Sequence, residues 1–111
     1  MGRRYVLAHD LGTTGDKVIL FDIESGSAVG SAFVPYPTEY PSATQAEQDP
    51  NDWWEAFCRA TQEVLGRTGI SAERIAVVSF SGQMMGCVPV SADGAPLRKA
   101  IIWADQRATK E

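Results

Sequence analysis

The first 36 residues alternate in hydrophobic and polar character with the period of β-strands. Within Tyr5–Leu11, successive side chains fall on opposite faces, so that His9 lies on one face and Asp10 on the other. Lys17–Ile23 is almost continuously apolar, as in strands that are buried on both faces, and Ala28–Tyr36 is a third strand-like run. Because short turns separate the three runs, we expect an antiparallel meander.

A helix is expected to begin after Asp49, which suits the N-cap, with Pro50 at the first helical position. Apolar residues then recur at helical spacing at Trp53, Phe57, Ala60 and Val64. Gly66 or Gly69 is expected to end the helix. We therefore interpret the segment "EQDPNDWW" as helix capping and core anchoring, which is a structural role. The polar, Pro-rich segment before it is either a surface wrap or a functional loop.

The second half of the chain predicts one more long strand. Ile75–Gly82 is rich in β-branched residues and is expected to be buried, while Asp93-Gly94 marks a hairpin turn with Pro89 at an edge. The helix has the length of a right-handed crossover, which would set Ile75–Gly82 parallel to the first strand. The element order predicts an α/β fold, with a three-strand antiparallel meander, a crossover helix and a parallel strand.

Composition narrows the function classes. With 111 residues, the chain is at most one small domain or a piece of a larger one. A net charge of −4 with scattered basic residues argues against a nucleic-acid surface. No apolar run approaches the roughly 18 residues of a membrane span. Cys58 and Cys87 are interpreted as free, buried thiols of a reducing compartment, so we expect a cytoplasmic protein.

The turn "DLGTTGDK" between the first two strands carries candidate chemistry. We expect Gly12 and Gly15 to adopt positive φ and to bring backbone N–H groups close to an anion. The hydroxyls of Thr13 and Thr14 add donors. An ordinary hairpin turn is the alternative interpretation, since Gly, Thr and Asp are common in turns.

The ends of the same turn carry opposite charges. Asp10 could hold Mg²⁺ directly or through water, and Lys17 places a positive charge across the turn. His9 is the only histidine, which excludes a histidine-based metal site or catalytic triad within this chain. We expect His9 to pack near the turn.

Four segments, "DLGTTGDKVILFD", "EQDPNDWWEA", "SFSGQMMG" and "IIWADQRA", together resemble the start of the FGGY carbohydrate kinases, especially the xylulokinase-like branch. The resemblance covers the chain from Tyr5 to its end. It implies an actin-like (ribonuclease H-like) ATPase fold with two domains around a cleft, in which residues 1–111 are the amino-terminal portion of the first domain.

The resemblance also implies roles for the turn. Asp10 matches the acid near the Mg²⁺ of ATP, Lys17 matches a helpful basic position, and the phosphate-wrapping turn corresponds to Gly12, Thr13 and Thr14. Gly15 and Asp16 depart from the residues usual in the family. We expect Asp16 to point outward, since its charge would otherwise oppose phosphate binding.

The segment "SGQMMG" follows a strand end, where α/β sheets commonly bind ligands. Gln83 can donate to and accept from a sugar hydroxyl. The resemblance makes Gln83, Met84 and Met85 substrate contacts, although Met85 stands where a histidine is usual and no charged pair typical of glycerol kinases is present. Core packing is the alternative interpretation of the two methionines.

In "WADQR", the residues Trp103, Asp105 and Arg107 lie at alternate positions and would share one face if extended. An aromatic wall, an acceptor and a forked cation suit sugar binding. The alternative is a buried tryptophan beside a surface ion pair.

The implied reaction is transfer of the ATP γ-phosphoryl group to a sugar or polyol, a pentulose such as xylulose being favoured over an alditol. The resemblance puts the aspartate base beyond residue 111, so no catalytic residue is assigned and this chain alone is expected to be inactive. Completion by another copy, as a homo-oligomer, is a further expectation. A non-catalytic nucleotide-binding or interaction module with the same meander is the alternative function.

Overall fold

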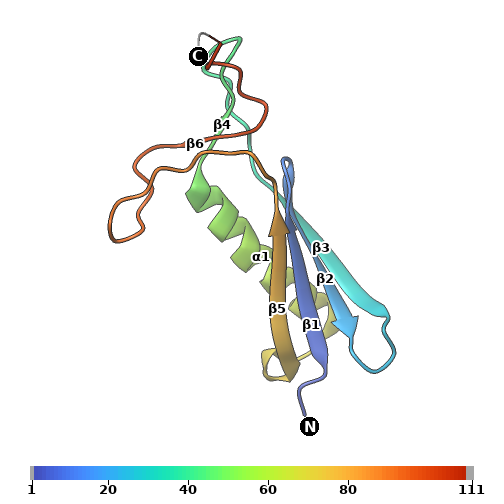
Figure 1. The fold of residues 1–111 in the computed structure, drawn as a ribbon. Helices are drawn as coiled ribbons and strands as arrows, with labels where there is room; N and C mark the ends of the chain where they lie inside the picture. The colour runs from blue at the N-terminus through green and yellow to red at the C-terminus, as the bar shows by residue number, and fades with distance from the viewer. Residues whose placement is uncertain (1, 110–111) are drawn as a thin grey trace.

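The computed structural model describes residues 2–109, which form a four-stranded sheet covered on one face by a single long helix (Figure 1). The strands β1 (Tyr5–Leu11), β2 (Gly15–Asp22) and β3 (Ala28–Pro35) form the meander. The helix α1 (Pro50–Thr68) leads to β5 (Ile75–Gly82), and the sheet order is β3-β2-β1-β5. β5 runs parallel to β1 and the other pairs are antiparallel, so the predicted α/β topology is confirmed.

Two short strands lie apart from this sheet. β4 (Glu47–Gln48) pairs antiparallel with β6 (Ala100–Ile101), near the end of the main sheet where β5 finishes (Figure 1). The segment between β5 and β6 folds back at Gly94, whose φ is +86°, which confirms the predicted turn. A three-residue 3₁₀ helix, η1 (Ala72–Arg74), precedes β5. In the described part of the chain, no helix is long and apolar enough to cross a membrane.

Local signals set the ends of α1 as predicted. The Asp49 carboxylate accepts the backbone N–H of Asn51, and Pro50 begins the helix. Of the two predicted end points, Gly69 is the correct one: its φ is +71° and its N–H donates to the Leu65 carbonyl at 2.9 Å.

The core lies between α1 and the meander. Small residues of the helix pack against alternate residues of the sheet, so the helix approaches closely. The buried apolar residues of this core are Leu7, Val18, Leu20, Ala32, Val34, Tyr36, Ala56, Ala60 and Val64. Trp53 and Phe57, which belong to the predicted stripe, are only half-buried.

Three burial expectations are wrong. β2 has one buried face rather than two, because α1 covers only one side of the sheet. β5 is largely exposed: Val78 is 48% and Phe80 71% accessible, since β5 is the edge strand beyond the reach of α1. The cysteines are free as expected but not buried, Cys58 being half-buried and Cys87 exposed.

Candidate functional site

In the turn between β1 and β2, the backbone carbonyl groups accept hydrogen bonds, whereas two backbone N–H groups have no acceptor among the described residues. Tyr36 donates from its hydroxyl to the Gly12 carbonyl and from its backbone N–H to the Thr14 carbonyl (3.2 Å). The Thr13 carbonyl accepts from Nε2 of Gln48 at 2.7 Å. Among residues 2–109, the N–H groups of Thr13 and Thr14 have no acceptor. The turn can therefore donate two backbone hydrogen bonds to an anion.

Burial keeps Tyr36 in its donating form. Burial first, and then the nearby charges of Asp16 and Asp10, raise the pKa of Tyr36 to about 12. A tyrosine hydroxyl is already protonated at neutral pH, and the raised pKa extends to higher pH the range over which Tyr36 donates to the Gly12 carbonyl.

The glycines shape this turn by their small size. Neither Gly12 nor Gly15 has positive φ, so that expectation is wrong. A Cβ on Gly15 would lie 2.5 Å from the Val34 carbonyl oxygen and 2.8 Å from Cα of Pro35. Gly15 is needed because β3 passes this close to the start of β2. The Gly12 N–H donates to the Gly15 carbonyl at 3.0 Å and closes the turn.

Asp10 and Lys17 are directly opposite each other in the β1–β2 register. Both are exposed, on the face of the sheet that α1 does not cover. The Ser81 hydroxyl at the end of β5 donates to Oδ1 of Asp10 at 3.2 Å. An acid and a base therefore share the open face beside the turn.

The side chain of Asp16 points into the core under α1, so the expectation that it points outward is wrong. Its side chain is fully buried under α1, 2.6 Å from Nδ1 of His9, which is buried as well. Nε2 of His9 lies 3.1 Å from the Thr61 hydroxyl, whose own proton goes to the Phe57 carbonyl. Asp16 has the same strand parity as Val18, so the alternation of β2 turns it inward. Its charge therefore faces an imidazole rather than the turn.

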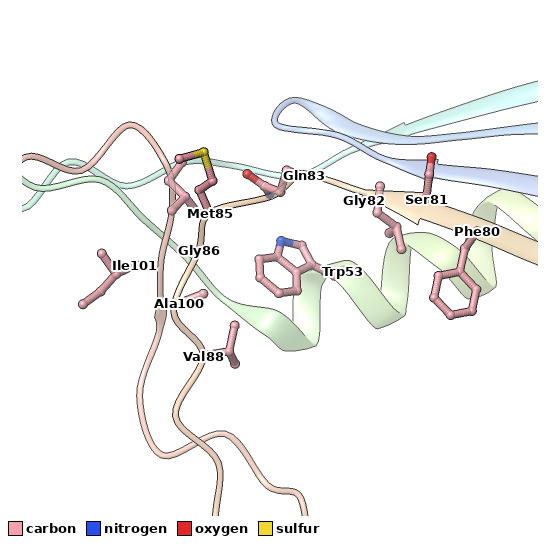
Figure 2. A pocket seen from close by; sticks show the side chains of 12 residues that line it. Trp53, Phe80, Ser81, Gly82, Gln83, Met85, Gly86, Val88, Ala100 and Ile101 are labelled. Carbon is pink, nitrogen blue, oxygen red and sulfur yellow. The ribbon is translucent and has the colours of Figure 1, made fainter.

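A cavity of about 410 Å³ lies between the end of β5, the start of α1 and β6 (Figure 2). Its wall is mostly apolar, with Ser81 and Gln83 as its polar side chains. The backbone N–H of Gln83 donates to the Leu11 carbonyl at 2.9 Å, and both residues line the cavity. Nε2 of Gln83 lies 3.4 Å from the Gly12 carbonyl. The cavity thus adjoins the turn.

The methionine pair is not packed in a core formed by the described residues. Met84 is 77% and Met85 89% accessible. Met85 lines the cavity and has a φ of 65°, the one positive φ of a non-glycine residue in the described chain. Met84 is not part of the cavity wall.

The residues of "WADQR" do not share one face, because the chain turns at Trp103. Trp103 is exposed and its indole N–H donates to the Thr13 hydroxyl at 2.9 Å. Asp105 and Arg107 instead form an ion pair with each other, and Arg107 also reaches Glu47 at 2.7 Å. Arg107 holds the pKa of the Asp105 carboxyl well below its usual value. The structure brings Trp103 to the turn and leaves the other two in a separate network.

Residues 5–111 match the N-terminal domain of the FGGY family of carbohydrate kinases. The chain belongs to this family. It is 39% identical to a xylulose kinase of Staphylococcus epidermidis over 107 residues and 38% identical to a glycerol kinase of Marinomonas over 106. The two matches cover 96% and 95% of this chain but 21% of each relative, so the chain spans about a fifth of the length of the curated relatives it matches.

The solved structures agree with this assignment. The crystal structure of xylulose kinase from Rhodospirillum rubrum aligns with a TM-score of 0.86 at 29% identity. The alignment covers 96% of this chain and 22% of that one. The amino-terminal actin-like fold of the FGGY kinases, expected from the resemblance, is therefore confirmed.

FGGY kinases use ATP, and the residues at the turn fit a phosphate group with its metal. Thr13 and Thr14 offer free amides, and the exposed carboxylate of Asp10 is an oxygen ligand of the kind that Mg²⁺ prefers. Within residues 2–109, no group of three or more His, Cys, Asp or Glu side chains gathers into a metal site. A Mg²⁺ ion at Asp10 would need water or phosphate oxygens as its other ligands.

Sequence reasoning missed Gln48. The prediction gave its segment a purely structural role, but the Gln48 amide contacts the turn at Thr13 and the cavity at Trp53 and Gln83. A polar residue beside a helix N-cap gives no signal of such distant contacts. Its position could be found only from the folded chain.

Proposed function

We propose that this chain is the part of an ATP-dependent sugar kinase that binds the phosphates and one side of the sugar. The observation that carries the proposal is the pairing of free amides at Thr13 and Thr14 with the exposed Asp10 carboxylate, beside a cavity that shares Gln83 with the turn. Phosphoryl transfer depends mainly on positioning and charge neutralisation, and such an arrangement supplies both.

Each side chain has a distinct task in this proposal. ATP with Mg²⁺ supplies the phosphoryl group. The amides of Thr13 and Thr14 donate to phosphate oxygens, Asp10 holds the metal directly or through water, and Lys17 adds positive charge on the same face. Because Asp16 is buried against His9, its charge does not oppose the phosphates.

The cavity would hold the sugar. In this proposal Gln83 bonds a hydroxyl, Met85 contacts the carbon skeleton, and Trp103 is a wall toward the phosphates. Met84 is exposed and lies outside the cavity wall, and Asp105 and Arg107 hold the loop that carries Trp103. No carboxylate lines the cavity among the described residues, so the base that accepts the hydroxyl proton has to come from elsewhere. We therefore expect the isolated chain to be inactive.

Titration of the ¹⁵N-labelled chain with Mg²⁺–ADP tests the phosphate site. We expect the amide resonances of Thr13 and Thr14 to shift, and Asp10→Asn to weaken binding in Mg²⁺ but to have little effect in its absence. Asp93→Asn, on the distant hairpin, is the matched control. Unchanged Thr13 and Thr14 resonances would contradict phosphate binding at this turn.

A linear pentulose such as xylulose is the substrate that we propose, with a small alditol as the second candidate. The alditol stays a candidate substrate because of Met85. Its apolar side chain at the cavity wall offers the sugar no polar partner at this position. The two relatives, a xylulose kinase and a glycerol kinase, are almost equally similar to this chain. A panel of ketoses and alditols, assayed by ADP release with the kinase in full length, distinguishes them through kcat/KM.

A further inference from the structure

The side chain of Gln48 joins four parts of the molecule that are distant in sequence. Its Nε2 donates to the Thr13 carbonyl at 2.7 Å and to the Thr38 hydroxyl at 2.8 Å. Its Oε1 accepts from the indole N–H of Trp53 at 2.9 Å and from Nε2 of Gln83 at 2.8 Å. Both donors and both lone pairs of this buried amide are therefore used.

The donors and acceptors in this network are assigned from the groups that can only donate or only accept. An indole N–H can only donate and a backbone carbonyl can only accept. Gln48 therefore turns its oxygen toward Trp53 and its nitrogen toward Thr13. Gln83 must then donate with its own nitrogen, which leaves Oε1 of Gln83 as the remaining acceptor. This oxygen is buried and has no partner among the described residues.

Gln48 itself lies outside both proposed ligand sites. Trp53 and Gln83 line the cavity, as Figure 2 shows, whereas Thr13 belongs to the turn. Gln48 is not part of the cavity wall. Any effect that it has on a ligand must therefore pass through these three neighbours.

We propose that Gln48 is a positioning residue that fixes the phosphate turn relative to the sugar cavity and sets Gln83 to accept a hydrogen bond from the substrate. The inference rests on the proposed function. The ligand that fits is a polyol with a hydroxyl that donates at this point. Because Oε1 of Gln83 is closed off from solvent, the hydroxyl reaches it by moving the loop at Met85, whose positive φ marks a strained backbone.

The isosteric variant Gln48→Glu tests the bridge in the ligand-free chain. It removes both donors and sets a carboxylate oxygen against the Thr13 carbonyl. We expect the amide resonances of Thr13 and Thr14, the indole N–H of Trp53 and the side-chain amide of Gln83 all to move. Gln62→Glu, on the exposed face of α1, is the matched control and leaves them in place. A lower melting temperature with unchanged turn and cavity resonances would overturn the proposal.

The effect on ligands is measured with two probes, Mg²⁺–ADP for the turn and D-xylulose for the cavity, well below the melting temperature of each variant. We expect Gln48→Glu to weaken both by about tenfold, the loss of a buried hydrogen bond. Equal affinities in the variant and the parent would show that Gln48 is merely structural, and would overturn the proposal. A parent chain that binds neither probe would instead refute the proposed function, and with it the positioning role.

A series of substrate analogues tests the polarity of Gln83. Replacing each hydroxyl in turn by hydrogen or by fluorine separates donation from acceptance, because fluorine cannot donate. At the hydroxyl that contacts Gln83, we expect the fluoro analogue to bind no better than the deoxy analogue. A fluoro analogue that retains the parent affinity at every position would show that Gln83 does not act as the acceptor.

Discussion

Asp16 places an acidic side chain in the interior of the protein, beside His9. It is fully buried, its one hydrogen-bonding partner is His9, and its Oδ1 has no partner in the described part of the chain. The ring of Phe57 stacks on His9 with centroids 3.8 Å apart, which keeps the imidazole in place. The pair therefore links the start of β2, beside the β1–β2 turn, to α1 and has no contact with solvent.

Removing one member of this pair should be costly. We expect Asp16→Ala to lower the free energy of unfolding by about 1–3 kcal/mol, because the buried Nδ1 of His9 loses its hydrogen-bond partner. Lys17→Ala, at the next position but on the open face, should change it by less than about 0.5 kcal/mol. Urea denaturation of both variants measures the difference. Similar values for the two would show that the buried pair contributes little.

Two glycine substitutions should change stability in opposite directions. A methyl group on Gly15 would meet the backbone of β3, so Gly15→Ala should destabilise the chain by about 1–3 kcal/mol. Gly66 lies within α1 with open space around it, so Gly66→Ala should stabilise the chain by about 0.5–1 kcal/mol. Urea midpoints measure both, and a Gly15→Ala midpoint equal to or above that of the parent would contradict the close approach at Gly15.

At the level of elements, an ion pair joins the start of β1 to the end of β2. Arg4 donates to both carboxylate oxygens of Asp22, at 2.9 and 2.6 Å. These hydrogen bonds, with a backbone bond from Glu24, lower the pKa of Asp22 to about 2. In the folded state Asp22 therefore stays ionised at pH values where the unfolded chain binds a proton.

This difference predicts an acid-dependent loss of stability. Between about pH 4 and pH 2 the unfolded state binds more protons at Asp22, so the free energy of unfolding falls as the pH decreases. Arg4→Gln should reduce this fall, because the pKa of Asp22 returns toward its usual value. Denaturation at a series of pH values measures the difference between parent and variant. Parallel curves for the two would contradict the role of Arg4.

The elements themselves were predictable because their signals are local. The cap at Asp49, the stop at Gly69 and the strand alternation depend on neighbouring residues. Asp16 was misplaced because the expectation rested on its charge beside a phosphate site, whereas β2 begins at Gly15 and its alternation turns Asp16 inward. The exposure of β5 could not be predicted, since it depends on which strand becomes the edge and how far α1 reaches.

The site was only partly predictable, because local signals mark the turn but not the tertiary contacts around it. The turn and its charged ends lie within eight residues of sequence, and the structure does bring Asp10 and Lys17 opposite each other. The contacts of Gln48 with Thr13 and Gln83, and of Trp103 with Thr13, join residues that are 35 or more positions apart. Such pairings follow from tertiary packing and leave no periodic pattern in the chain.

For the whole molecule, the exposed β5 has the strongest consequence. Val77, Val78 and Phe80 are all exposed on a strand with an unpaired edge, an arrangement that favours pairing with another chain. We therefore expect the 111-residue chain to associate with itself as its concentration rises.

Phe80→Lys should shift the equilibrium toward monomer, because a lysine on an edge strand opposes edge-to-edge pairing. Ile23→Lys, at a comparably exposed apolar residue just beyond β2, is the matched control. Sedimentation velocity over a range of concentrations measures the association. A parent chain that stays monomeric and melts cooperatively would show that β5 tolerates solvent without a partner.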